Sequence, residues 1–240
     1  MVDIHCHRVK AASNWQILSV DIHQIIECQN SEFQHLLQTA DRLQTQPNDI
    51  SSPSNFYFSL GVHPWFLERQ DIASAMRMLN HYRHHPRLLA VGECGLDKTI
   101  PPDLSKQIIV FRKQIELAEG WQKPLVIHCV RAFNELTQIK KAVKSTQPWI
   151  IHGFNNNPQL AEQLLKQDCY LSLGKALLQK QSNAAQVLQN MPLDRLFLET
   201  DDASDISISA IYDAAAKMTG LTIDALRQRI FSNFKRVFFQ

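Results

Sequence analysis

The sequence lacks a long apolar run, a block of positive charge and a glycine-rich phosphate loop, and each absence excludes a class of protein. No apolar stretch approaches the roughly 20 residues of a membrane-spanning helix. The opening MVDIHCH has neither the charged nor the apolar region of a signal peptide. Neither GxSxG nor GxxxxGK[ST] occurs. The formal charge is only +2, so any contact with nucleic acid would be local. We therefore expect no membrane association.

Composition points to an ordinary globular protein. The five cysteines are odd in number and lack the spacing of a disulfide framework, which favours a reduced, cytoplasmic setting. A chain of 240 residues, 45% of them apolar, can bury the core of one αβ barrel or of two small domains. Because no internal repeat or linker interrupts it, we expect a single domain over residues 1–240. Nothing in the sequence indicates an obligate protein partner.

Strand-like and helix-like segments alternate along almost the whole chain. The expected strands are residues 2–7, 15–23, 57–63, 87–92, 124–128, 149–152, 169–173 and 195–200. The expected helices are residues 31–45, 71–84, 103–119 (with Gly120 as C-cap), 131–145, 158–167, 182–190, 206–218 and 222–238. This alternation predicts a parallel sheet with helical crossovers, and eight strands predict a TIM-type (β/α) barrel.

The start of the barrel departs from this pattern. Only about seven residues separate the first two expected strands, whereas a parallel crossover needs about a dozen or more. Either the second strand runs antiparallel or the first crossover helix is missing. We therefore expect a barrel that is shortened or distorted near its first crossover.

Six side chains that commonly bind metals lie at the ends of five of the apolar runs. They are His5 and His7 in VDIHCH, Glu93 in LLAVGECG, His128 in PLVIHC, His152 in WIIHGF and Asp201 in LFLETDD. Because the carboxyl ends of the strands of a parallel barrel meet at one face, we expect these side chains to converge. Four imidazoles and two carboxylates predict one or two divalent cations.

The carboxylates indicate how such a site would work. Glu93, on an expected glycine-flanked turn, offers two oxygens that can bind one cation each. Glu199 and Asp202 are alternative candidates for the role of Asp201, but the position of Asp201 relative to the strand end matches that of the other expected ligands. Asp201 could both bind a cation and deprotonate water. Asp97 is expected beside the ligands rather than among them. Because a divalent cation lowers the pKa of bound water to about 7, hydrolysis is the predicted chemistry.

Taken together and in order, these motifs resemble the TatD family of metal-dependent hydrolases over nearly the whole chain. The matching segments are DIHCH, LGVHP, VGECGLD, VIHC, IHGF and LETD. The resemblance implies a TIM-type barrel with two divalent ions (Zn, Mg, Mn, Fe or Ni) and hydrolysis of phosphodiester bonds, as by a deoxyribonuclease. It also implies that one ion binds His5, His7, Glu93 and Asp201, while Glu93 bridges to a second ion on His128 and His152.

Several further side chains are candidates for contact with a phosphate-ester substrate, possibly DNA. By the resemblance, His63 contacts a substrate phosphate; a turn histidine before Pro64 is the alternative. Arg131 in HCVRAF is displaced by one position from the family pattern, so it either reaches a phosphate or begins a helix in solvent. Lys175 follows another strand end, in YLSLGK. Trp65 either stacks on a base or simply packs.

Two other functions remain open. One is a metal-dependent amide or lactone hydrolase on the same barrel; many such sites are bridged by a carboxylated lysine, whereas Glu93 stands at the corresponding strand here. The other is a metal-binding protein without turnover. The convergence of six costly polar groups argues against the second alternative, because a protein without chemistry has no physical reason to keep them together.

Overall fold

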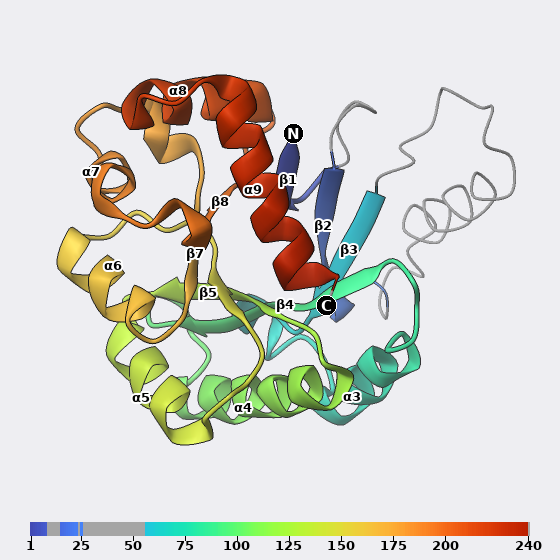
Figure 1. Cartoon of the computed structure of the whole chain (residues 1–240). Helices are drawn as coiled ribbons and strands as arrows, with labels where there is room; N and C mark the ends of the chain where they lie inside the picture. The colour runs from blue at the N-terminus through green and yellow to red at the C-terminus, as the bar shows by residue number, and fades with distance from the viewer. Residues whose placement is uncertain (9–14, 24, 26–55, 240) are drawn as a thin grey trace, which may run out of the picture.

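A computed structural model describes residues 1–8, 15–23, 25 and 56–239 of the protein. Eight parallel strands form one sheet in the order of the sequence (Figure 1). A parallel bridge between Cys6 and Asp201 joins the first strand to the segment just after the last. The strands are β1 (Val2–Cys6), β2 (Trp15–Asp21), β3 (Phe56–Gly61), β4 (Leu88–Asp97), β5 (Leu125–Val130), β6 (Trp149–Ile151), β7 (Tyr170–Leu173) and β8 (Leu196–Leu198). The predicted TIM-type barrel is therefore confirmed.

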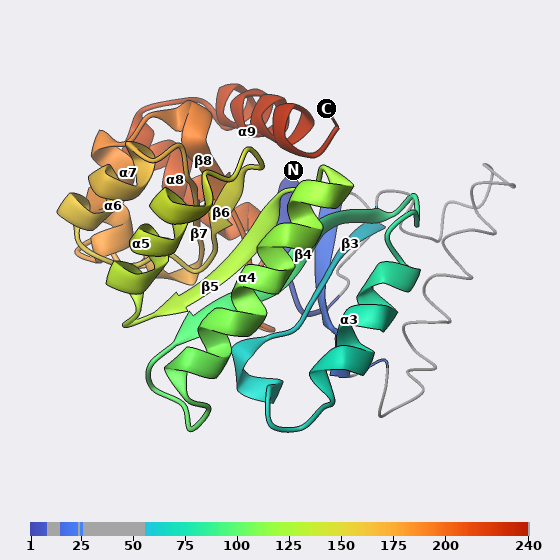
Figure 2. The ribbon, with the colours of Figure 1, turned by 90° about the horizontal axis from the view of Figure 1, so that it is seen from below.

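The described helices lie on the outer side of the sheet, as Figures 1 and 2 show. They are α3 (Ile72–His81), α4 (Leu104–Trp121), α5 (Phe133–Val143), α6 (Pro158–Leu165), α7 (Asn183–Asn190), α8 (Ile208–Thr219) and α9 (Ile223–Phe238), with short 3-10 helices η1 (Pro64–Phe66), η2 (Lys175–Leu178) and η3 (Leu193–Arg195). In the described parts of the chain, none of them is long and apolar enough to cross a bilayer. The expected helix 31–45 lies outside the described residues.

The first two strands are parallel, so the antiparallel alternative for the second strand is wrong. Most of the connection between them, residues 9–14, lies outside the described residues. The β1–β2 register shifts between Asp3 and Cys6, which fits the expected distortion near the start. Similar shifts occur between β3 and β4 and between β4 and β5, so the irregularity is not confined to the first crossover.

The apolar runs that predicted strands are buried because both faces of the sheet are covered. Strand β4 is buried at every position from Leu88 to Asp97. One core cluster packs most of the barrel against α4 to α9, with Trp149 fully buried, and a second fills the space around β2, β3 and α3. Continuous burial of parallel strands explains why they are uniformly apolar until they reach polar ends.

Strand β4 is longer than predicted and carries Glu93 inside it. The expected glycine-flanked turn is wrong: β4 continues to Asp97, and its register with β5 shifts between Val91 and Cys94. A bulge of this kind re-aims the side chain it carries. Gly95, at φ 137°, permits the close approach of the two strands, because a Cβ there would lie 2.0 Å from the carbonyl oxygen of His128.

The predicted C-cap of α4 is also wrong. The helix continues through Gly120 to Trp121, and Gln122 takes the left-handed conformation at φ 54°. A Cβ added at Gly120 would have no atom within 4 Å. Gly120 is therefore a glycine inside a helix, with no steric requirement for it.

Gly95→Ala should destabilise the fold by about 1–3 kcal/mol or more, because the new methyl group overlaps the β5 backbone. Gly120→Ala is the matched control and should stabilise by about 0.5–1 kcal/mol, since alanine favours the helix. Urea unfolding of both variants and the parent protein measures the two changes. Equal stabilities of the Gly95→Ala variant and the parent would show that the strand contact does not require glycine.

Candidate metal centre

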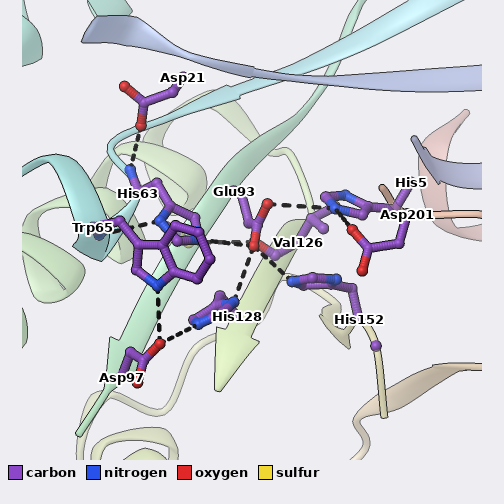
Figure 3. A network of polar contacts seen from close by, with 12 residues as sticks. His5, Asp21, His63, Trp65, Glu93, Asp97, Val126, His128, His152 and Asp201 are labelled. Carbon is purple, nitrogen blue, oxygen red and sulfur yellow. Dashed lines mark hydrogen bonds and ion pairs between the residues drawn. The ribbon is translucent and has the colours of Figure 1, made fainter. Parts of the chain in front are cut away.

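The other five side chains predicted at the strand ends lie around the carboxylate of Glu93. Figure 3 shows four of them, His5, His128, His152 and Asp201. The set comes from five strands: His5 from β1 and His7 just after it, Glu93 from β4, His128 from β5, His152 directly after β6 and Asp201 beyond β8. Glu93 is only 5% exposed, and His5 is fully buried. The barrel therefore brings together all the side chains predicted to bind metal.

One oxygen of Glu93 faces the two histidines of the first strand. His5 Nε2 and His7 Nε2 lie 3.4 and 3.6 Å from Glu93 Oε2. Each of these nitrogens also lies 3.4 Å from Asp201 Oδ1. Ligand atoms around a tetrahedral zinc with bonds of about 2.0–2.1 Å are roughly 3.4 Å apart. The spacing of this group therefore fits a single divalent cation.

The other oxygen of Glu93 faces a separate group of imidazoles. Glu93 Oε1 lies 2.7 Å from His152 Nε2, 3.1 Å from His128 Nδ1 and 3.0 Å from His63 Nε2. The ligand atoms of His63, Glu93 and His128 all lie within 4.8 Å of one another. Glu93 thus presents one oxygen to each of two groups, as a carboxylate that bridged two cations would.

Buried carboxylates lie against the outer nitrogens of two of the three histidines of the second group. Asp97 Oδ2 lies 3.0 Å from His128 Nε2, and Glu199 Oε1 lies 3.6 Å from His152 Nδ1. Glu199 is fully buried and accepts a hydrogen bond from the backbone N–H of Gly153. When the outer nitrogens carry protons, His128 Nδ1 and His152 Nε2 could bind a cation once any proton on these inner nitrogens is released. Metal-binding histidines commonly have such outer carboxylate partners.

The neutral ring of His63 carries its proton on the nitrogen that faces Glu93. Its Nδ1 accepts a hydrogen bond from the backbone N–H of Trp65 at 3.1 Å, so the proton of the neutral ring lies on Nε2. That Nε2–H then donates to Glu93 Oε1 at 3.0 Å. Burial lowers the pKa of His63, although the neighbouring Glu93 carboxylate opposes this shift. The lowered pKa keeps the ring neutral. His63 is therefore a hydrogen-bond donor.

The carboxylates and imidazoles shift one another's pKa values in opposite directions. Burial and the charge of His152 oppose a proton on His5, but Glu93 and Asp201 outweigh them and raise the pKa of His5 to about 9. Burial would raise the pKa of Glu93, yet His152 and His5 hold it well below its usual range. At Asp201, too, burial is outweighed, and His5 and His7 lower the pKa. The site holds ionised carboxylates that attract positive charge.

Two buried histidines of the site have ring nitrogens that no well-directed hydrogen bond satisfies. Within the described residues, this is true of both ring nitrogens of His5 and both of His152, although carboxylate oxygens lie near them. Buried polar atoms normally have hydrogen-bond partners. Imidazole nitrogens beside ionised carboxylates are the donor set of a divalent-metal site. The residues present therefore fit the predicted cations.

A cavity of about 420 Å³ opens over the site. Its lining includes six residues beyond the predicted ligands: Ser19, Asp21, His63, Trp65, Phe66 and Asp202. Arg131 does not line this cavity and instead faces a separate depression among Asn134 and Asn156. Lys175 is exposed and donates to Asp202 Oδ1 at 2.9 Å. The substrate roles of Arg131 and Lys175 stay predictions, and the structure does not place either residue in the cavity.

Asp21, at the end of β2, lies in the site although it is not among the residues predicted from the sequence. Its oxygens accept hydrogen bonds from the backbone N–H groups of His23 at 2.7 Å and His63 at 2.6 Å. Burial raises the pKa of Asp21 to about 7, although those hydrogen bonds oppose the rise. Asp21 fixes the backbone on which His63 stands. The pattern that predicted the ligands, a polar side chain at the end of an apolar run, also occurs at the end of this strand, where Asp21 follows Ser19 and Val20. The same pattern could therefore have identified Asp21.

The fold and the site define a barrel enzyme whose chemistry depends on metal ions. The sequence model of the family described as TatD related DNase matches residues 2–239. The chain belongs to this family, which confirms the predicted class, a metal-dependent hydrolase.

Similar proteins have varied names. The chain is 35% identical over 150 residues to the human 3'-5' RNA nuclease TATDN2, a match covering 60% of this chain but only 19% of that protein. It is 26% identical over 214 residues to the metal-dependent hydrolase YjjV of Escherichia coli (strain K12), which covers 83% of this chain and 78% of that protein.

Solved structures of the family have the same fold. The crystal structure of YjjV superposes with a TM-score of 0.81 at 21% identity, covering 100% of this chain and 98% of that chain. A TatD family hydrolase from Entamoeba histolytica gives a TM-score of 0.76 at 15% identity, covering 99% and 97%.

The affinity of the metal-free protein for Mn²⁺ or Zn²⁺ should rise with pH. Protons on His5 and His152 compete with cations. Burial opposes both protons, but neighbouring carboxylates raise both pKa values, that of His5 to about 9, so cation binding near neutral pH must release them. Calorimetric titration between about pH 6.5 and about pH 8 should show the affinity rising about tenfold per pH unit. A plateau above about pH 7 would mean that His5 has an ordinary pKa.

Proposed function

We propose that this protein is a two-metal phosphoesterase that hydrolyses the phosphodiester bonds of nucleic acid, with DNA as the first candidate. The observation that carries the proposal is the placement of Glu93, whose two oxygens face two separate groups of ligand atoms. His5, His7 and Asp201 would hold one ion with Glu93, and His128 and His152 would hold the other.

Bound divalent cations would lower the pKa of water, so that hydroxide is available near neutral pH. Their positive charge would also neutralise negative charge on the phosphoryl oxygens. Side chains of the protein position the histidines that would bind these cations. Asp97 is hydrogen-bonded to the outer nitrogen of His128, and Glu199 lies 3.6 Å from that of His152, while the inner nitrogens of both rings face Glu93. Ligand orientation of this kind requires no rearrangement when substrate arrives.

Asp201 is the best placed group to take the proton of the attacking water. Its side chain is 28% exposed and lines the cavity, whereas that of Glu93 is 7% exposed. Neighbouring imidazoles, His5 and His7, outweigh the effect of burial and lower its pKa, so it is ionised at neutral pH. An ionised carboxylate that water can reach is a suitable general base.

His63 would donate a hydrogen bond to a phosphate oxygen. Its proton lies on Nε2, which points into the site, and burial keeps the ring neutral. A neutral donor can shift from Glu93 Oε1 to a substrate oxygen without gaining or losing charge. This geometry supports the predicted contact of His63 with phosphate and argues against its being a turn histidine alone.

The names of similar proteins support a phosphodiester substrate. The family is described as TatD related DNase, and the human relative is named a 3'-5' RNA nuclease. The Glu93 bridge, in place of a carboxylated lysine, favours phosphoester over amide or lactone hydrolysis.

The test is cleavage of end-labelled single-stranded DNA and RNA by the purified protein with Mg²⁺, Mn²⁺ or Zn²⁺. Asp201→Asn should lower the rate by about 10²- to 10⁴-fold, the usual contribution of a general base. Circular dichroism would check that the variant remains folded. Asp205→Asn is the matched control, because Asp205 is an exposed aspartate four residues further on that does not line the cavity.

Elemental analysis after metal-replete purification tests the two-metal arrangement independently. We expect two equivalents in the parent protein and one or fewer in Glu93→Gln, which loses the bridging charge. Cleavage of a lactone panel but of no phosphodiester would refute the proposed substrate class. Full activity of the Asp201→Asn variant would remove Asp201 from the mechanism.

A further inference from the structure

Trp65 places a large aromatic surface at the edge of the cavity. It lies in η1, directly after the His63-Pro64 pair, and its side chain is 54% exposed. Four other large apolar side chains in the described parts of the chain are comparably exposed, namely Ile109, Leu178, Ile223 and Phe239. None of these four lines the cavity over the metal centre, whereas Trp65 does.

The indole ring is fixed in place. Its Nε1–H donates a hydrogen bond to Asp97 Oδ2 at 2.9 Å (Figure 3). Asp97 is itself held by Thr99, whose backbone N–H and hydroxyl donate to Oδ1 at 2.8 and 2.5 Å. The ring also stands edge to face with His63 and His128, at centroid distances of 5.1 and 6.0 Å. A ring held this firmly loses little conformational freedom when a ligand binds to it.

The charge of the cavity favours a ligand that brings more than a phosphate group. The described lining contains the carboxylates Asp21, Glu93, Asp201 and Asp202 and no lysine or arginine. Apart from bound cations, a phosphate would therefore find mainly the N–H of His63. A planar aromatic group next to the phosphate would gain contact area on Trp65 without adding charge to the cavity.

We propose that Trp65 is the stacking platform for the nucleobase of the nucleotide whose phosphate is cleaved. This inference rests on the proposed phosphoesterase function and names the substrate as base-bearing. Base and phosphate of a nucleotide are joined through one sugar, and the indole stands against His63 and His128, whose ring nitrogens face Glu93. Stacking tolerates every base, because each has a flat face. The platform should therefore serve DNA and RNA equally.

The platform is coupled to the metal centre through Asp97. The same oxygen, Oδ2, accepts from Trp65 Nε1 and lies 3.0 Å from His128 Nε2. Replacing the indole could thus weaken catalysis in two ways, by removing the stacking surface or by disturbing His128. Only the first depends on whether the substrate carries a base, and the test must separate the two.

The test compares two oligonucleotides that differ only in whether the nucleotide at the cleaved phosphate carries its base or is abasic. In the Mn²⁺-loaded protein, Trp65→Ala should lower kcat/KM for the base-bearing substrate by about 5- to 150-fold, equivalent to about 1–3 kcal/mol of stacking. Cleavage of the abasic substrate should change by less than about twofold. Trp65→Phe, which keeps a flat ring, should recover most of the loss in both DNA and RNA versions.

Ile109→Ala is the control, since Ile109 is 55% exposed on α4 but does not line the cavity. It should leave both substrates unaffected. An equal loss on base-bearing and abasic substrates in the Trp65→Ala variant would overturn the proposal, because the residue would then act only through Asp97 and His128. A loss confined to RNA would overturn it as well, since it would indicate recognition of the 2′-hydroxyl.

A binding measurement distinguishes failure of this inference from failure of the proposed function. Adenosine 5′-monophosphate should quench the fluorescence of the Mn²⁺-loaded parent protein, while ribose 5-phosphate should not. The quenching should be absent in Trp65→Phe. If the protein cleaves no phosphodiester but shows this quenching, the platform stands and the proposed reaction fails. If it cleaves DNA but adenosine monophosphate leaves Trp65 emission unchanged, the reaction stands and the platform fails.

Discussion

The structure depends on keeping one ionised carboxylate, that of Glu93, almost out of contact with water. Removing an isolated carboxylate from water is costly, and the group would normally take up a proton instead. Here histidines contributed by three strands, His5, His128 and His152, surround it and hold its pKa well below the usual range despite burial. Each imidazole reaches Glu93 only if its own strand ends at the same face of the barrel as the others. The barrel therefore has to close for the charge to be stabilised, and the charge marks the position of the site.

The same arrangement explains why the site favours cations. In the protein alone, protons compensate the charges of the buried Glu93 and the partly buried Asp201, and the pKa of His5 rises to about 9. Cations that replace those protons would satisfy the ring nitrogens of His5 and His152, which lack well-directed hydrogen bonds within the described residues. Asp97 and Glu199, further out, direct the rings inward. The site is thus arranged in layers around Glu93, each layer fixing the orientation of the one inside it.

The sequence was sufficient to predict the parallel barrel and the side chains that meet in it, because a ligand at the end of a buried strand needs no knowledge of distant contacts. It was insufficient where distant contacts decide. The bulge that places Glu93 inside β4 depends on how closely β4 approaches β5 at Gly95. The tautomer of His63 depends on a backbone N–H two residues away. Arg131 and Lys175 follow the ends of β5 and β7 as predicted, but Arg131 faces a separate depression, and Lys175 pairs with Asp202 at the cavity without lining it.

The contact of Trp65 with Asp97 joins two tasks that could have been separate. An exposed indole could lie at the cavity edge without a hydrogen bond, and Asp97 could orient His128 without Trp65. Because Asp97 Oδ2 contacts both residues, a shift of the indole of Trp65 would also move the ring of His128, which faces Glu93. The pKa of Asp97 is lowered to about 2, since Thr99, Trp65 and His128 together outweigh its burial, so this oxygen remains an acceptor throughout the neutral range. A ligand seated on the indole therefore meets a metal centre whose geometry is held by the same carboxylate.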